Sequence, residues 1–340
     1  MKLIKTEDAV GHVLCHDITQ IIKGVTKDAV FRKGHIVTKE DIPVLLSVGK
    51  ENLYVWEKDD NLLHENEAAE ILYEISADEN MHGTEVKEGK IELIADIDGL
   101  LMIDRERLKS INSLGEMMIA GRHSGFPVKK GDKLAGTRII PLVIEKEKME
   151  KAKSLTEGAP IFSLLPYKIK TAGVVTTGSE VFKNRIEDTF TPVIVEKLSE
   201  YGIEMTMHSI CSDDHEDITR EINKMLEEGV EIVICTGGMS VDPDDRTPLA
   251  IKNAGTDIIT YGAPVLPGAM FLLSYKGEVP VIGLPGCVMY AKRTIFDLVL
   301  PRLAAGVRLS KEDIDCLGEG GLCLSCPVCH YPNCGFGKGV

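Results

Sequence analysis

The segment TGGMSVDPDD, residues 236–245, combines two glycines with three aspartates. Gly237 and Gly238 can adopt positive φ and leave backbone N–H groups uncovered, which is the geometry that lets a phosphate approach the main chain. Aspartates do not bind phosphate directly, but Mg²⁺ is commonly shared between one or two carboxylates and a substrate phosphate. The spacing therefore predicts a phosphate beside a divalent cation. The alternative is an Asx turn within the Asp-Pro segment, residues 242–245.

The elements around this segment are predicted to alternate between strand and helix from residue 168 onward. Strands are expected at KIKTAGVVTTG, EMTMHSIC and VEIVICTGG, and helices at TFTPVIVEKLSEYG and HEDITREINKMLEEG. Such alternation requires crossover connections, so we predict an α/β domain with a doubly wound, mostly parallel sheet. Ligands in such sheets lie at the carboxyl ends of the strands. Three strand ends there carry polar residues, namely Thr177 to Glu180, Ser212 to Asp214, and Thr236 to Ser240.

The rest of the chain is predicted to form smaller units. Residues 1–80 read as a small α/β N-terminal unit, and residues 81–150 as a β-rich domain, a barrel or sandwich, because β-branched runs alternate with Gly, Asp and Lys-Lys-Gly turns. A charged linker, residues 151–167, leads to the α/β domain at residues 168–308. Residues 309–340 form a cysteine-rich tail.

Four segments resemble, in order, the motifs of the molybdenum cofactor biosynthesis domain family, which molybdopterin adenylyltransferases and molybdopterin molybdotransferases share. They are TTGSEV (176–181), SDDHEDI (212–218), TGGMSVDPDD (236–245) and PVLPGAMFLLSYKGEVPVIGLPG (264–286). The last segment is most similar to the molybdotransferase branch. Three positions depart from the family pattern: Ser179 replaces an acid, and Cys287-Val288 stand where molybdotransferases have Asn-Pro.

The resemblance implies the roles of individual residues. It implies catalytic roles for Glu180, Asp214 and Asp245. It implies a molybdopterin cradle of Thr177, Gly178, Ser179, Thr236, Gly237, Gly238, Ser240, Pro267, Gly268, Pro285 and Gly286. It implies a metal site with Asp213, Asp242 and Asp245. The implied cofactor is Mg²⁺, which would neutralise phosphate charge and assist AMP departure, and the implied substrates are adenylylated molybdopterin and molybdate.

The tail contains Cys323, Cys326, Cys329 and Cys334 in the spacing C-x2-C-x2-C-x4-C. In a cytoplasmic protein, thiols at this spacing indicate Zn²⁺ or an iron–sulfur cluster rather than disulfides. The first three cysteines are spaced as in a bacterial ferredoxin, but the fourth lies one residue farther along. CPVCH also fits c-type haem attachment, which requires export and is not expected here. A tail of free thiols is the alternative.

The charge balance limits the partners of the protein. With 39 basic and 53 acidic residues the net charge is −14, which argues against nonspecific binding to nucleic acid or an anionic membrane. Charged residues interrupt the N-terminus, and no stretch reaches the roughly 18 uncharged apolar residues of a membrane span. We therefore predict a cytoplasmic protein without nucleic-acid or membrane partners. We expect it to bind a molybdopterin-type small molecule, to form a homodimer, and to meet a molybdenum enzyme or another cofactor-biosynthesis protein.

The predicted function is molybdate insertion into adenylylated molybdopterin, with release of AMP, by an enzyme most like a molybdopterin molybdotransferase. One alternative is adenylylation of molybdopterin by ATP, which the shared domain also supports. A second is a delivery protein that binds the cofactor without completing the chemistry. Ser179 and Cys287-Val288 favour binding alone, whereas the retained acids at Glu180, Asp213, Asp214 and Asp245 favour the enzyme.

Overall fold

The computed structural model describes residues 2–22, 26–55, 61–183, 185–240, 242 and 245–339. The chain divides into two compact units. The first contains residues 1–94, 104–121 and 133–161, and the second contains residues 95–103, 122–132 and 162–340. Among the helices in the described ranges, none has both the length and the apolar composition needed to span a bilayer.

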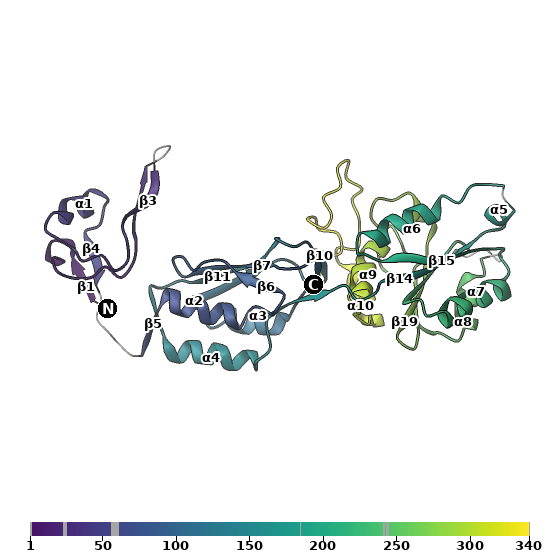
Figure 1. The fold of residues 1–340 in the computed structure, drawn as a ribbon, viewed down its shortest axis with the longest axis horizontal. Coiled ribbons are helices and arrows are strands. Elements are labelled where there is room, and N and C mark those ends of the chain that lie inside the picture. Colours follow the sequence, from purple (N-terminus) through teal and green to yellow (C-terminus); the bar gives the residue numbers. More distant parts are fainter. Residues whose placement is uncertain are drawn as a thin grey trace. The chain divides into compact units, whose positions relative to one another are not determined.

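A six-stranded sheet forms the centre of the second unit (Figure 1). In spatial order its strands are β15 (Glu204–Cys211), β14 (Thr171–Thr177), β16 (Ile232–Thr236), β19 (Val279–Leu284), β18 (Leu272–Lys276) and β17 (Asp257–Tyr261). The first four are parallel, while β18 runs antiparallel to both of its neighbours. The doubly wound, mostly parallel sheet predicted from the sequence is confirmed.

Helices cover both faces of this sheet. One face is covered by α6 (Phe190–Ser199) and α9 (Ile295–Ala304), and the other by α7 (His215–Glu227) and α8 (Thr247–Asn253). Because successive side chains of a strand point to opposite faces, Val174 and Ile234 pack with α6 and α9, whereas Val175 and Cys235 pack with α7 and α8. The alternating pattern along β14 and β16 thus builds two apolar cores at once.

Helix α7 illustrates why these segments are helical. Its buried residues Ile218, Ile222 and Met225 recur at helical spacing and form the apolar stripe that faces the sheet. The Asp214 carboxylate accepts a hydrogen bond from the backbone N–H of Glu216 at 2.9 Å and so caps the first turn. The sequence pattern and the cap therefore place α7 directly after the end of β15.

The remaining elements of the second unit are short. They are β8 (Gly99–Ile103), β10 (Phe126–Val128), β13 (Phe162–Pro166), α5 (Ser179–Phe182), α10 (Lys311–Asp315) and the 3-10 turns η2 (Gly286–Met289) and η3 (Cys316–Gly318). The first three form an antiparallel sheet in the order β10-β8-β13. Residues 319–339 contain neither helix nor strand, apart from an isolated bridge that joins Leu322 to Leu266.

The first unit is a second α/β arrangement. Its strands are β1 (Lys2–Lys5), β2 (Ile18–Ile22), β3 (Thr26–Phe31), β4 (Asn52–Val55), β5 (Leu62–His64), β6 (Met81–Gly83), β7 (Lys90–Ala95), β9 (Met117–Gly121), β11 (Lys133–Ile139) and β12 (Val143–Glu145). Its helices are η1 (Thr6–Asp8), α1 (Asp41–Ser47), α2 (Glu65–Glu74), α3 (Arg105–Asn112) and α4 (Lys146–Thr156). Four strands form an open sheet in the order β6-β7-β11-β9.

The sheet of the first unit packs against helices, so it is neither the barrel nor the sandwich that the strand-and-turn pattern predicted. Helix α2 contacts β11, and α3 contacts β9. Helix α3 was missed because it is short and strongly polar, and only Ile111 is buried. Of the predicted linker at residues 151–167, the first part belongs to α4 and Phe162–Pro166 form β13. The predicted domain boundaries stay a prediction.

Replacing Asp104 with alanine is expected to lower the free energy of unfolding of the first unit by about 1 kcal/mol, because Asp104 caps α3. Its carboxylate accepts from the backbone N–H of Arg107 at 2.9 Å. Hydrogen exchange across α3, followed by mass spectrometry, measures the change. The matched control is Arg105→Ala, since Arg105 is exposed in the same turn. Equal exchange in both variants would contradict the capping role.

Candidate functional site

The four predicted motifs follow four neighbouring parallel strands. TGSE follows β14, the two aspartates follow β15, TGG follows β16 and LPG closes β19. Because the strands are parallel, all four motifs lie at the same edge of the sheet. The chain leaves β14 for β15 on one side and then returns to β16 on the other, so β14 and β16 flank the topological switch point, where ligands bind in open α/β sheets.

A hydrogen bond joins the first two motifs. The backbone N–H of Ser179 donates to Oδ2 of Asp213 at 2.9 Å. The neighbouring Asp214 carboxylate caps α7, and its Oδ1 lies 3.6 Å from Nδ1 of His215. The backbone of Glu180 lies in α5, but its side chain is outside the described residues. Of the two aspartates, Asp213 therefore places its carboxylate beside the first motif, whereas the Asp214 carboxylate caps α7.

The glycine segment after β16 packs directly against the end of β14. A Cβ at Gly237 would lie 2.3 Å from the carbonyl oxygen of Thr177, so only glycine allows this approach. The Thr247 hydroxyl donates to the Gly237 carbonyl at 2.8 Å and lies 3.3 Å from the Thr177 hydroxyl. Gly238 has a φ of 57°. The structure thus brings Thr177, Gly237 and Gly238 together.

The loop that follows the glycines is closed by Asp245. Its Oδ2 accepts from the backbone N–H of Ser240 at 2.9 Å, and its own N–H donates to the carbonyl of Asp242 at 2.9 Å. The Tyr261 hydroxyl donates to the Met239 carbonyl at 3.0 Å and holds the start of this loop. Burial, and then the negative charge of Asp245, raise the pKa of Tyr261. Asp244 lies outside the described residues.

The closing motif forms an apolar corner. A Cβ at Gly268, where φ is 129°, would lie 2.5 Å from Cγ2 of Ile295 in α9, so Pro267-Gly268 packs tightly on that helix. After Pro285 the chain enters η2, which begins at Gly286 and in which Val288 is fully buried. Burial also raises the pKa of the Cys287 thiol. Val288 is thus a core residue. It belongs to the pair Cys287-Val288, at which this chain departs from the molybdotransferase pattern.

The donor atoms at this edge suit a phosphate and a hard cation. The glycine segment offers backbone N–H groups as donors to a phosphate. Asp213 and Asp245 offer carboxylate oxygens, and oxygen is the ligand that Mg²⁺ prefers. In addition, the Thr236 hydroxyl at the end of β16 is buried and has no hydrogen-bond partner among the described residues. Within the described ranges, no group of three or more His, Cys, Asp or Glu side chains is placed to hold a metal ion.

Sequence reasoning missed a polar cluster beside the same edge. His208 on β15 lies 3.1 Å from the Thr176 hydroxyl and 3.2 Å from the Thr191 hydroxyl. Oδ2 of the neighbouring Asp188 lies 3.7 Å from Nε2 of His208. Burial favours a higher pKa for Asp188, but hydrogen bonds from Thr191 and Phe190 outweigh it and lower this pKa. The cluster fixes the start of α6 against β14 and β15. Only the histidine within the predicted strand EMTMHSIC could have indicated it.

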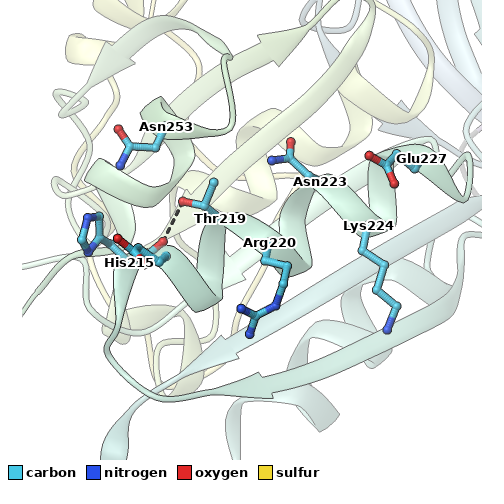
Figure 2. A pocket seen from close by; sticks show the side chains of 8 residues that line it. His215, Thr219, Arg220, Asn223, Lys224, Glu227 and Asn253 are labelled. Carbon is cyan, nitrogen blue, oxygen red and sulfur yellow. Dashed lines mark hydrogen bonds between the residues drawn. The ribbon is translucent and has the colours of Figure 1, made fainter.

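A shallow groove of about 700 Å³ runs along α7 (Figure 2). It begins at His215, next to Asp214, and is lined by His215, Glu216, Thr219, Arg220, Asn223, Lys224, Glu227 and Asn253. Figure 2 shows the Thr219 hydroxyl donating to the carbonyl of His215, at 2.6 Å. The groove contains none of the residues predicted to bind the cofactor.

All nine cysteines are free thiols. Eight of them fall into two groups, and the ninth, Cys287, is half-buried. Cys15, Cys211 and Cys235 are buried, as expected for small apolar residues, and burial raises the pKa of Cys211 to about 11. Five further cysteines lie in the tail, where Cys323 and Cys334 are half-buried while Cys316, Cys326 and Cys329 are exposed. The tail thiols are therefore the accessible ones.

Comparison with known proteins agrees with the motifs. Residues 173–305 match the family described as "Probable molybdopterin binding domain". Residues 3–57 match a "Domain of unknown function (DUF8806)". The predicted resemblance to the molybdenum cofactor biosynthesis domain family is confirmed for the second unit, which carries a domain related to molybdenum cofactor biosynthesis proteins.

Similarity to individual proteins is partial. A CinA-like protein of Mycobacterium tuberculosis is 38% identical over 76 residues, which are 22% of this chain and 18% of the relative. A CinA-like protein of a Mycobacterium species is 37% identical over 89 residues, 26% of this chain and 21% of the relative. The chain thus spans about a fifth of the length of these relatives.

Solved structures similar to this chain include two described as MoaB. The molybdopterin biosynthesis enzyme MoaB from Thermus thermophilus is 19% identical, with a TM-score of 0.33, over 41% of this chain and 98% of that chain. The tungsten cofactor synthesizing protein MoaB from Pyrococcus furiosus is 21% identical, with a TM-score of 0.34, over 42% of this chain and 99% of that chain.

Proposed function

We propose that the domain at residues 168–308 binds adenylylated molybdopterin at the edge formed by β15, β14, β16 and β19, and inserts molybdate with release of AMP. The observation that carries this proposal is the convergence of four motifs at the switch point of one sheet. The Ser179 N–H donates to Asp213, which joins the first two motifs, and the Thr247 hydroxyl contacts both Gly237 and Thr177, which joins the third motif to the first. A site held this way is preorganised for an extended ligand.

The proposed roles follow from the chemistry of the groups. Backbone N–H groups at Gly237 and Gly238 would receive the phosphates, which a chain with a net charge of −14 otherwise repels. Asp213 and Asp245 would hold Mg²⁺, which when bound neutralises phosphate charge and assists departure of AMP. The Ser240 N–H keeps the Asp245 carboxylate oriented. In this reaction water would cleave the phosphoanhydride of the substrate and release AMP. The two thiols of the substrate would bind molybdenum and give their protons to one molybdate oxygen, which leaves as water.

The second candidate is a delivery protein that binds the cofactor without this chemistry. Three observations favour it: Ser179 replaces an acid, Val288 fills the closing corner, and Asp214 is engaged as a helix cap. Adenylylation of molybdopterin by ATP would use the same edge of the sheet. It is distinguished by pyrophosphate release from ATP when unmodified molybdopterin is supplied.

Changing Thr236 to valine is expected to weaken molybdopterin binding about tenfold, because the ligand would lose one hydrogen bond. The free energy of unfolding should stay equal or rise, since the variant removes a buried hydroxyl that has no partner in the described structure. Isothermal titration calorimetry and denaturant unfolding measure the two quantities.

The matched control is Thr260→Val, because the buried Thr260 hydroxyl donates to the Gly262 carbonyl at 2.8 Å. This control should lose about 1 kcal/mol of stability and keep its affinity. An unchanged affinity in the Thr236 variant would remove that hydroxyl from the proposed site.

A further inference from the structure

The cysteine-rich tail encloses a second cavity in the second unit, with a volume of about 610 Å³. We call it the tail cavity. Its walls include Cys323, Cys326, Cys329, Cys334, Lys292 and Arg293. All four cysteines of the C-x2-C-x2-C-x4-C motif thus line one space, although they are spread over residues 323–334. Cys316, the fifth cysteine of the tail, does not line it.

Both ends of the tail are fixed to the unit. The Cys323 N–H donates to the Leu266 carbonyl, and the Leu266 N–H donates to the Gly321 carbonyl, each at 2.8 Å. Near the other end Phe336 is buried in the main core, and the Tyr331 hydroxyl donates to the Asp297 carbonyl at 2.7 Å. Cys323 and Cys334 are therefore held in place, packed against that core.

The segment between these anchors is not stabilised by a core of its own. Residues 324–330 are all exposed and contain neither helix nor strand, and Leu324 and Val328 are 78% and 65% exposed. Ser325 has a φ of 50°, a left-handed conformation that is uncommon for a residue other than glycine. Segments this small, with so little buried surface, are usually held by a disulfide or a metal, and no disulfide is present among the nine cysteines.

The charge of the tail cavity fits an anionic occupant. The lining residues include Lys292 and Arg293 but no carboxylate, although the chain as a whole carries a net charge of −14. Arg293 pairs with Asp297 at 2.8 Å, so the positive charge comes mainly from Lys292, whose Nζ donates to the Pro327 carbonyl at 2.9 Å. A zinc ion or iron–sulfur cluster bound by four thiolates is negatively charged overall. Cations in the wall stabilise such a centre, because nearby charges and hydrogen bonds tune thiolate metal sites.

We propose that the tail cavity is a metal site in which Cys323, Cys326, Cys329 and Cys334 bind Zn²⁺ or an iron–sulfur cluster as thiolates. In the described arrangement no three of these side chains are placed to hold a metal ion. Binding therefore closes the exposed segment 324–330 over Cys323 and Cys334, and each ligating thiol releases its proton to solvent. Metal binding and folding of the segment are one event.

The test uses the full-length chain, purified without oxygen, with zinc, iron and acid-labile sulfide measured. After treatment with a chelator, Zn²⁺ alone is added and iodoacetamide alkylation of each cysteine is followed by mass spectrometry. Alkylation of Cys326 and Cys329 should slow at least about tenfold, because a metal-bound thiolate is a poor nucleophile. Alkylation of the exposed Cys316 should not change, which makes it the internal control.

The variant Cys326→Ser with Cys329→Ser should lose at least about 90% of the metal, while the matched control Cys316→Ser should retain it. Zinc without sulfide identifies a zinc site, and iron with equimolar sulfide and visible absorption identifies a cluster; both outcomes support the proposal. The proposal is overturned if the double variant keeps its metal. It is equally overturned if the purified chain contains neither zinc nor iron and added Zn²⁺ leaves alkylation unchanged.

Discussion

Replacing Asp297 with alanine is expected to lower the free energy of unfolding of the second unit by about 3–5 kcal/mol, because it leaves the buried Lys197 ammonium without its partner. Oδ1 of Asp297 lies 2.6 Å from Nζ of Lys197 and 2.8 Å from the Arg293 guanidinium, and the side chains of Asp297 and Lys197 are only 2% and 9% exposed. Burial favours a lower pKa for Arg293, but the negative charge of Asp297 outweighs it and raises this pKa. The variant loses a capping box with Thr294 as well.

Hydrogen exchange of the α9 amides under native conditions measures this loss for the second unit alone. The matched control is Asp313→Ala, which removes an equivalent capping box with Ser310, but at an exposed site. We expect that control to cost about 1 kcal/mol. If both variants lost the same stability, the buried ion pair would have no special role.

Changing Asp245 to asparagine is expected to reduce molybdate-dependent AMP release about 100-fold or more, which is the effect of removing one electrostatic group from an active site. The fold should be preserved, because asparagine still offers an oxygen to the Ser240 N–H. What the variant loses is the negative charge proposed to hold Mg²⁺. Initial rates of AMP formation at saturating Mg²⁺ measure the change.

Asp257→Asn is the control for that experiment. It removes the same charge from an exposed position at the start of β17, the edge strand that is three strands away from β16 in the sheet. Its rate should equal that of the unchanged chain. A rate in the Asp245 variant as high as in this control would remove Asp245 from the reaction and leave it only the task of closing the loop at Ser240.

The order of helices and strands in the second unit could be predicted because local patterns of apolar residues indicate each of them. Apolar periods of two and of 3.6 residues define β14, α6, β15, α7 and β16 within a few residues of their observed bounds. Parallel pairing then follows from the alternation itself. In the first unit the same reasoning missed α3, because a short polar helix with one buried residue has almost no apolar period.

The candidate site was predictable only in part. The glycines and aspartates are recognisable by type and spacing, but the partners that hold them come from distant segments. Thr247 contacts Gly237 and also Thr177, which lies 70 residues away along the chain. Lys197 and Asp297 are 100 residues apart. No local pattern records such pairs, so their buried charge could not be foreseen.

The tail was recognised as a cluster of thiols, but its position was not predictable. Its anchor is a parallel bridge between Leu266 and Leu322, formed between distant parts of the chain by backbone hydrogen bonds that residues of almost any type could make. Backbone pairing of this kind carries no side-chain signature. The sequence therefore indicated the four thiols of the proposed metal site, and the structure adds the cavity and the anchored ends.

The most direct test of the central claim is AMP formation by the purified full-length chain supplied with adenylylated molybdopterin and Mg²⁺, before and after molybdate is added. The proposed function predicts tight binding of the adenylylated ligand and AMP release that begins only with molybdate. Tight binding without AMP at any molybdate concentration would contradict the transferase and establish a binding or delivery protein instead.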